Sequence, residues 1–238
     1  MDDPFTEPTD TREAILGAAF RALRKHGYAN VTVQRIGDEF DKSPSLVYHH
    51  YDGKDDLLVD LMGFLLDRFE ASIADGGDQN ASPSDEGGDM PPEAAFERSA
   101  RDQLDDYLTA AVDPESLDDP YAPDARFVTV MTDLRSQAAS DEAYRDHFDR
   151  SDRVFGEYLE RLVREAAAET SRDGAERTDG ERPVDPATVA ATLQTFATGG
   201  MFRWATTNEK GWVADSRAGI DQYLEATLPL VASAESDE

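Results

Sequence analysis

The sequence contains no cysteine, which excludes disulfide bridges, thiolate zinc sites and cysteine nucleophiles together. It also lacks any run of about 18 consecutive apolar residues, the length that a membrane-spanning helix needs. The first residues, MDDPFTEPTDTR, have no basic region followed by an apolar run, so they do not read as a signal peptide. These absences predict a cytoplasmic protein with no membrane partner.

Lysine is scarce, at four residues against nineteen arginines, and 51 acidic residues give a formal net charge of −28. The acidity is spread along the chain and is not gathered in a tail. Net charge of this size acts on solubility and association, and not on the fold. Because many carboxylates keep a surface hydrated at high salt, the composition predicts adaptation to a salt-rich cytoplasm, as in a haloarchaeon.

Motifs of catalysis and metal binding are missing as well, including HExxH, the P-loop, GxSxG and Glu-x-x-His pairs. The neighbours His49 and His50 would point about 100° apart on a helix, so they cannot easily chelate one ion. The sequence therefore predicts no enzyme activity, no metal ion and no cofactor.

Apolar residues recur at helical spacing almost everywhere, and no segment alternates as a strand does, which predicts an all-α protein. Asp10 is placed to cap the first helix and Gly27 to end it. Polar stretches rich in Gly and Pro separate some of the later helices. The expected helices span about residues 10–26, 33–40, 44–50, 54–74, 93–112, 124–139, 141–169, 186–207 and 214–232.

Two short helices joined by a tight turn, near residues 33–50, have the spacing of a helix-turn-helix motif. Ile36 and Phe40 of the first would pack against Val47 of the second. From residue 11 to residue 54, seven basic residues face five acids, so this segment is free of excess negative charge. A DNA-facing surface needs that, because phosphate attraction supplies most non-specific affinity. The pattern predicts double-stranded DNA as a partner.

The stretch TREAILGAAFRALRKHGYANVTVQRIGDEFDKSPSLVYHHYDGKDDLLVDLM resembles the N-terminal DNA-binding domain of TetR-type transcriptional regulators. That family has an hGy turn after the first helix, a Thr capping the second, and an hxxYxHFxxKxxLL run. The resemblance implies a three-helix helix-turn-helix domain at residues 1–53 and a C-terminal helical bundle for ligand binding and dimerisation at 54–238. The matching residues are His26, Gly27, Tyr28, Thr32, Val47, Tyr48, His50, Tyr51, Lys54, Leu57 and Leu58.

The resemblance also implies which side chains contact DNA. Lys54 lies in the first turn of the fourth helix, where a cation opposes the helix dipole. A stray surface lysine is the plain alternative to a phosphate shared with the free amides of that turn. We expect His49 to face DNA and His50 to be packed. The implied phosphate contacts are Thr32, Tyr48 and Lys54, and the implied groove or backbone contacts are Gln34, Arg35, Ser43, Pro44, Ser45 and His49.

A homodimer is implied too, with the last two helices of each subunit forming a four-helix interface. Gly199 and Gly200 should each weaken the eighth helix by roughly 1 kcal/mol relative to Ala, but small residues let another helix approach closely. The predicted interface residues are Val189, Leu193, Phe196, Gly200, Trp204, Ile220, Tyr223, Leu224 and Leu228.

A pocket for a small-molecule effector among the C-terminal helices is the remaining family expectation. Plain core packing is the competing interpretation for each lining residue, because apolar stripes at helical spacing are usually core. Arg203 is charged within an apolar run and would pair with an acidic ligand or with an acid of the partner subunit. The candidate lining residues are Tyr107, Phe127, Met131, Phe155, Tyr158, Met201, Phe202 and Arg203.

The sequence thus predicts a ligand-responsive transcriptional regulator, more specifically a repressor, that binds a near-palindromic operator as a dimer. The alternative is an all-helical ligand-binding or adaptor protein that does not bind DNA specifically. Asp38, Glu39 and Asp41 favour this alternative, because carboxylates beside the motif repel phosphate.

Overall fold

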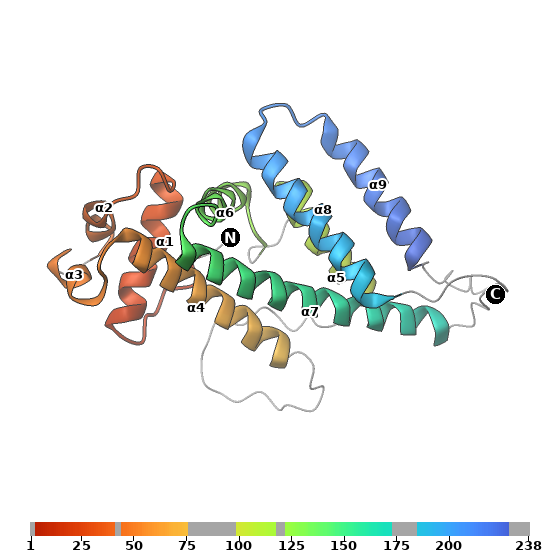
Figure 1. The fold of residues 1–238 in the computed structure, drawn as a ribbon, viewed down its shortest axis with the longest axis horizontal. Helices are drawn as coiled ribbons and strands as arrows, with labels where there is room; N and C mark the ends of the chain where they lie inside the picture. Colours follow the sequence, from red (N-terminus) through yellow and green to blue (C-terminus); the bar gives the residue numbers. More distant parts are fainter. Residues whose placement is uncertain (1–2, 41–43, 76–98, 118–121, 173–184, 229–238) are drawn as a thin grey trace, which may run out of the picture. The chain divides into compact units, whose positions relative to one another are not determined.

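In a computed structural model of the chain, the described residues are 3–40, 44–75, 99–117, 122–172 and 185–228. They form helices and no strand, so the all-α prediction is confirmed (Figure 1). The elements are α1 (Thr11–His26), α2 (Val33–Asp38), the 3-10 turn η1 (Pro44–Leu46), α3 (Val47–His50), α4 (Lys54–Asp75), α5 (Ala100–Val112), α6 (Ala125–Gln137), α7 (Glu142–Arg172), α8 (Pro186–Thr206) and α9 (Trp212–Thr227).

The chain packs as two compact units, each with its own hydrophobic core. Unit 1 comprises residues 1–96 and 118–154, and therefore holds α1 to α4, α6 and the beginning of α7. Unit 2 comprises residues 97–117 and 155–238, and holds α5, the rest of α7, α8 and α9. The predicted division into a DNA-binding domain at residues 1–53 and a ligand-binding and dimerisation domain at 54–238 is a division by function. It differs from these two packing units, and it stays a prediction.

Side-chain caps set the helix ends in unit 1, as expected from the sequence. The Asp10 carboxylate accepts from the backbone N–H of Glu13 at 2.8 Å, and Gly27 ends α1 with a φ of 71°, a conformation that suits glycine. The Thr32 hydroxyl accepts from the backbone N–H of Arg35 at 3.2 Å and caps the start of α2.

The expected start of α5 near residue 93 and the expected end of α9 near residue 232 lie outside the described residues.

The helix-turn-helix pair is shorter and less regular than predicted. The first helix ends at Asp38, and the second begins as a 3-10 turn before the four α-helical residues of α3. Turns of the 3-10 type are frequent at the ends of α-helices. The three residues expected to pack between the two helices are all buried in the core of unit 1: Ile36 is 0% exposed, Phe40 is 8% exposed and Val47 is 1% exposed.

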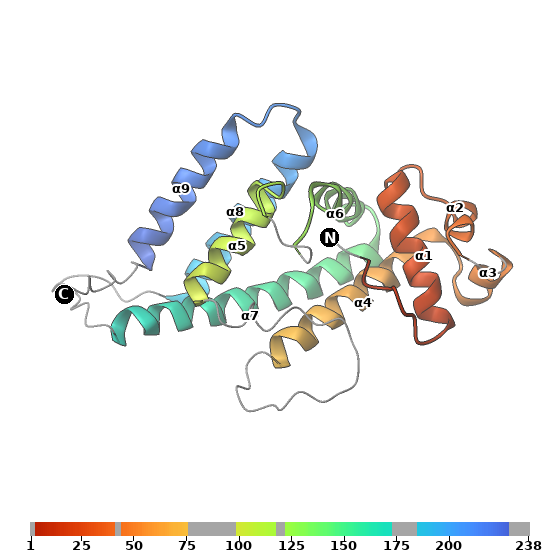
Figure 2. The same cartoon turned by 180° about the vertical axis from the view of Figure 1, so that it is seen from behind.

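In unit 2, α5 lies alongside α8, as Figures 1 and 2 show. Gly200 is the point of closest approach, since a Cβ added there would lie 2.5 Å from Val112 Cγ1 and 3.2 Å from the carbonyl oxygen of Ala111. A Cβ added to Gly199 would meet nothing within 4 Å. The prediction that small residues in α8 admit another helix is confirmed at Gly200, and the helix admitted is α5 of the same chain.

We expect Gly200→Ala to lower the free energy of unfolding by roughly 1–2 kcal/mol, because overpacking against α5 outweighs the gain in helix propensity. Gly63→Ala in α4 is the matched control, since its added Cβ would meet nothing within 4 Å. That substitution should raise the free energy of unfolding by about 1 kcal/mol. Urea titrations followed by circular dichroism at high KCl give both values, and equal stabilisation by the two would contradict the close approach.

Candidate nucleic-acid interface

The outer face of η1 and α3 is exposed, whereas its inner face is buried. Tyr48 is 65% exposed, and Ser45 and His49 are exposed beside it. Val47, on the inner face, is 1% exposed. His50 is also exposed, so the prediction that it packs inside is wrong: α3 ends there, and the ring lies beyond the side that faces the core. The element presents hydroxyl and imidazole groups, both of which can bond phosphate oxygens or base edges.

The predicted contact residues of α2 lie on its exposed side. Thr32, Gln34 and Arg35 are all exposed. The Gln34 amide donates to the Asp38 carboxylate at 3.4 Å, and the Arg35 guanidinium donates to a backbone carbonyl of the preceding turn. Of the remaining predicted DNA contacts in this motif, Ser43 lies outside the described residues and Pro44 is the first residue of η1.

Lys54 occupies the first position of α4 and reaches back to the turn after α1. Its ammonium lies 4.1 Å from the centroid of the Tyr28 ring and donates to the Tyr28 carbonyl at 3.3 Å. The contact is a cation–π interaction that holds the ammonium in one place. Because an ammonium carries three N–H donors, this arrangement leaves donors for a phosphate at the start of α4.

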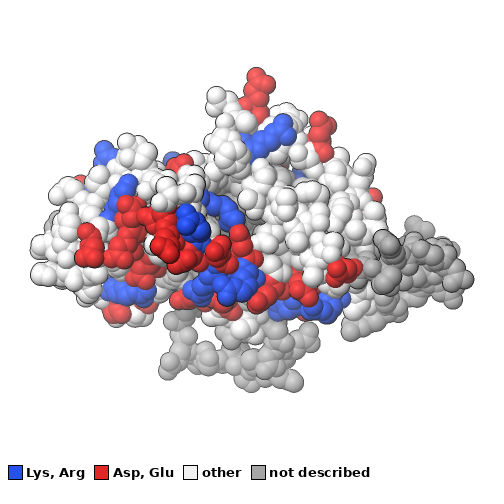
Figure 3. All heavy atoms as spheres, in the orientation of Figure 1, with Lys and Arg blue, Asp and Glu red and all other residues white. Residues whose placement is uncertain are grey.

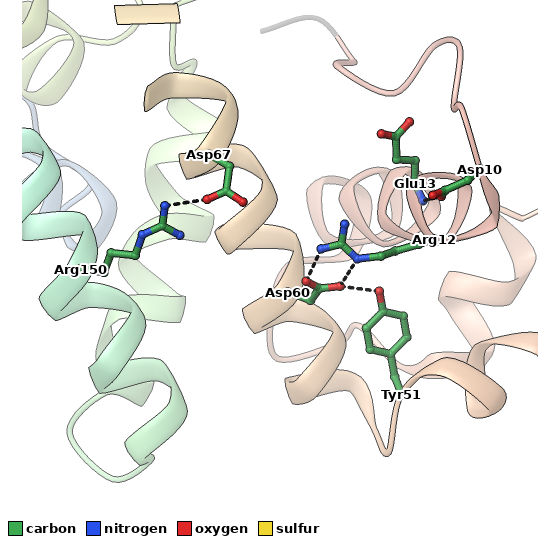
Figure 4. Close-up of polar contacts among 7 residues, drawn as sticks. All are labelled: Asp10, Arg12, Glu13, Tyr51, Asp60, Asp67 and Arg150. Atoms are coloured by element: carbon green, nitrogen blue, oxygen red, sulfur yellow. Dashed lines mark hydrogen bonds and ion pairs between the residues drawn. The ribbon is translucent and has the colours of Figure 1, made fainter. Parts of the chain in front are cut away.

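A partly buried carboxylate anchors the end of α3. Tyr51 donates its hydroxyl to Asp60 of α4 at 2.6 Å, and the Arg12 Nε of α1 donates to the same oxygen at 2.9 Å (Figure 4). Burial alone would raise the pKa of Asp60, but the hydrogen bonds from Arg12 and Tyr51 outweigh it and hold that pKa below its ordinary value. Burial also raises the pKa of Tyr51, so its hydroxyl keeps its proton. Three helices thus meet at one ionised group.

A second carboxylate joins the turn after α1 to α4 and α7. Asp55 accepts the hydroxyls of Tyr28 and Tyr144, each at 2.9 Å. Tyr144 is 1% exposed, and burial raises the pKa of Tyr28 to about 12. Sequence reasoning missed both carboxylate sites. The available signal was Tyr28 and Tyr51 within the family motif, but the other partners of the two carboxylates are far away in sequence: Arg12 lies 48 residues from Asp60, and Tyr144 lies 89 residues from Asp55.

One of the three carboxylates beside the motif is balanced by a cation. Glu39 pairs with Lys25 at 2.5 Å, and the hydrogen bond from Lys25 lowers the pKa of Glu39. Asp38 accepts from Gln34, and Asp41 lies outside the described residues. Figure 3 shows that the end of unit 1 where Figure 1 places α2 and α3 is largely uncharged on this face, whereas acidic and basic side chains adjoin each other over the neighbouring helices. The pairing of Glu39 weakens the case for a protein that avoids DNA.

The predicted effector residues are distributed over both units. Phe127 and Met131 belong to unit 1, where they line an apolar cavity of only about 10 Å³. In unit 2, the rings of Tyr107 and Phe155 lie 6.0 Å apart, and burial raises the pKa of the nearby Tyr158. The other three predicted residues are also in unit 2: Met201 is partly buried, Phe202 is 60% exposed, and the Arg203 guanidinium lies 4.5 Å from the centre of the Trp212 ring.

A groove of about 660 Å³ lies elsewhere in unit 1, among residues of α1, α4 and α7. Its charged lining includes Asp60, Asp67 and Arg150, and none of the eight predicted effector residues contributes to it. Arg150 pairs with Asp67 at 2.6 Å across it (Figure 4). Within the described ranges, no three His, Asp or Glu side chains are grouped so as to hold a metal ion. No helix in that part of the chain is long and apolar enough to cross a membrane.

Most of the predicted dimer residues face inward. Seven of the nine are buried in unit 2, so the side of α8 and α9 expected to face a partner instead packs against the chain's own core: Val189, Leu193, Gly200, Trp204, Ile220, Leu224 and Leu228. Only Phe196 and Tyr223 retain substantial exposure, and their rings lie 5.4 Å apart. Within unit 2, α5 contacts both α8 and α9, and it lies close against Gly200.

The opposite side of α8 is exposed and carries no charge along most of its length. No charged side chain occurs from residue 186 to residue 202, although 31% of the whole chain is charged. The exposed residues on this side between residues 186 and 202 are Ala187, Thr188, Ala191, Thr195, Gly199 and Phe202, and we call them the α8 outer face. Sequence reasoning followed the large apolar residues and missed this face, which the absence of charge indicated.

Residues 15–61 match the family described as "Bacterial regulatory proteins, tetR family". Among curated proteins, the chain is 36% identical over 55 residues to the HTH-type transcriptional repressor AcnR of Corynebacterium glutamicum, which covers 23% of this chain and 29% of that protein. It is 40% identical over 60 residues to the HTH-type transcriptional regulator BetI of Brucella anthropi, which covers 25% of this chain and 30% of that protein. The chain spans about a third of the length of the curated relatives it matches.

A solved TetR transcription regulator from Haloarcula marismortui is similar over nearly the whole chain. The two share 28% sequence identity with a TM-score of 0.63, over 91% of this chain and 97% of that one. The likeness therefore extends beyond the matched segment to the helices that follow it. Residues 15–61 belong to a tetR-type helix-turn-helix domain, and the chain as a whole has the fold of tetR-family transcriptional regulators.

Proposed function

We propose that the protein is a ligand-responsive transcriptional repressor that binds a near-palindromic operator as a homodimer. The observation that carries the proposal is the exposed face of α3, where Tyr48 and His49 point away from a core that holds Val47. Lys54 begins α4 and its ammonium is held against Tyr28 of the turn after α1, where it can bind a DNA phosphate. The name of the matched relative AcnR, a repressor, supports this sign of regulation.

High salt shapes how such an interface binds DNA. The Debye length is about 3 Å in molar salt, so long-range attraction between the protein and DNA is almost fully screened. Direct hydrogen bonds from Thr32, Gln34, Arg35, Ser45, Tyr48 and His49 must then carry most of the affinity. A surface that is nearly neutral, with each cation held in place, suits that condition better than a strongly basic one.

In this proposal, the distribution of charge determines which surface of the chain forms the dimer. A chain with a net charge of −28 repels its own copy, and only a face free of carboxylates avoids that repulsion at contact distance. The α8 outer face meets the requirement and exposes Phe202 at its end. Two copies joined there would present two α3 elements, and a spacing of about 34 Å would place them in successive major grooves.

The effector would bind in unit 2. The partly buried rings of Tyr107, Phe155 and Tyr158 would contact the apolar part of an effector. Tyr158 adds a hydroxyl, which lies 3.5 Å from Gln103 Oε1. Ligand pockets are typically apolar with a few such polar groups. An effector shifts the balance between DNA-binding and non-binding states only if it binds one of them more tightly.

Two substitutions of the same kind, three residues apart, separate DNA contact from structural support. Tyr48→Phe removes an exposed hydroxyl, so we expect operator affinity to fall about fivefold, the equivalent of one hydrogen bond, at unchanged stability. Tyr51→Phe removes the hydroxyl that Asp60 accepts and should lower the free energy of unfolding by about 1–2 kcal/mol.

The two measurements are fluorescence anisotropy on the gene's own upstream DNA in molar KCl and urea denaturation. A scrambled duplex of the same length controls for non-specific binding. Wild-type affinity for both duplexes alike, or full affinity in Tyr48→Phe, would refute operator recognition by α3.

A charge on the α8 outer face should break the dimer. Thr195→Asp places two carboxylates at the proposed interface, so we expect the mass from light scattering to fall from dimer to monomer in molar KCl. Thr129→Asp on α6 is the matched control, because both threonines are exposed and donate to the carbonyl four residues earlier, at 2.8 and 2.9 Å. Loss of the dimer in both variants, or in neither, would place the interface elsewhere.

A further inference from the structure

Residues 3–9, which precede α1, lie against α1 and α4 of unit 1, and we call them the N-terminal arm. Phe5 is 5% exposed, and its ring centroid lies 5.9 Å from that of Phe20 in α1 and 5.1 Å from that of Phe64 in α4. Arg68 of α4 donates to a backbone carbonyl of the arm at 2.9 Å. The arm is therefore held to unit 1 by the buried Phe5 ring and by the hydrogen bond from Arg68.

The sequence of α1 is adapted to the arm. A Cβ added to Gly17 would lie 2.6 Å from the Cβ of Phe5, closer than real Cβ contacts allow. Glycine inside a helix costs about 1 kcal/mol relative to alanine, so this position has a reason other than helix formation. Only glycine leaves room for Phe5 to lie on this side of α1.

Arg21 of α1 connects the arm to α2. Its Nη1 donates to Asp3 of the arm at 2.9 Å, and its Nη2 donates to the backbone carbonyl of Glu39 at 3.0 Å. The same Asp3 carboxylate accepts from the backbone N–H of Phe5 at 2.9 Å through its other oxygen. A planar guanidinium presents its donors in a fixed fork, so fixing one side of Arg21 also fixes the other.

The carbonyl of Glu39 belongs to the end of α2, where support is most needed. Glu39 is the C-cap of a helix that has only six residues, and a helix of that length is not stable alone. The last carbonyls of a helix lack partners within it, and a cation placed there satisfies them and matches the helix dipole. Lys25 adds a second cation by pairing with the Glu39 side chain.

We propose that the N-terminal arm is a positioning element for the helix-turn-helix motif. Asp3 orients Arg21, Arg21 fixes the end of α2, and α2 in turn sets where the chain leaves toward η1 and α3. The consequence for operator binding rests on the proposed function, whereas the consequence for α2 itself does not. The residues of this relay act through α2 and need not contact DNA themselves.

The test uses the full chain with Arg21→Met, Asp3→Asn and the double substitution. Arg135→Met is the matched control, because Arg135 forms a bidentate pair with Asp152 elsewhere in unit 1 and its side chain is 38% exposed against 39% for Arg21. Hydrogen–deuterium exchange of the α2 amides and anisotropy on the upstream DNA are measured for each variant in molar KCl.

We expect α2 amides to exchange about tenfold faster in Arg21→Met and unchanged in Arg135→Met, while α4 and α6 keep their protection in both. Asp3→Asn should show part of the effect, and the double variant should not exceed Arg21→Met, because both act through one relay. Operator affinity should fall at least fivefold with Arg21→Met.

Unchanged α2 exchange in Arg21→Met, an equal rise in Arg135→Met, or full additivity of Asp3→Asn would each overturn the role of the arm. If the wild-type protein does not prefer its upstream DNA over a scrambled duplex, the proposed function fails instead. The exchange data then still decide the role of the arm.

Discussion

The elements proposed to face DNA are too short to be stable alone, and side chains from the rest of unit 1 support them. The α2 helix has six residues and α3 has four, so neither gains enough from its own hydrogen bonds to persist. Burial of Ile36 and Val47 supplies the apolar part of the support. Side chains of α1 and α4 supply the polar part, at Asp60 for the end of α3 and at Arg21 for the end of α2. The positions of α2 and α3 are therefore fixed by contacts with the longer helices α1 and α4.

Charge imposes the second condition on this chain. The chain carries 51 acidic against 23 basic residues, but two regions depart from that balance: the motif between residues 11 and 54, and the α8 outer face. In the proposed function, the first meets a polyanion and the second meets an identical chain, so neither can carry the excess negative charge of the chain as a whole. The motif is free of excess negative charge because its seven basic residues outnumber its five acids, and one of those acids, Glu39, is paired with Lys25.

Local signals in the sequence predicted much of the fold and the exposure of Thr32, Gln34, Arg35, Ser45, Tyr48 and His49, whose contacts with DNA stay a prediction. The caps at Asp10 and Thr32 and the stop at Gly27 are confirmed, because each depends on neighbours within one or two turns. Tertiary pairing was beyond such reasoning. Tyr144 lies 89 residues from Asp55, and the side of α8 that α5 covers depends on where α5 packs. An apolar residue of an interface and one of the core look alike in sequence, which is why seven of the nine residues predicted for the dimer interface are residues buried within the chain.

The central claim is that two copies of α3, each held by unit 1, read one duplex together. Hydroxyl-radical footprinting of the upstream DNA in molar KCl tests it most directly, because it reports where the backbone is covered on each strand. The account predicts two protected patches related by a dyad, with their centres about 10 base pairs or a multiple of that apart. A single patch, or uniform protection at all protein concentrations, would contradict it.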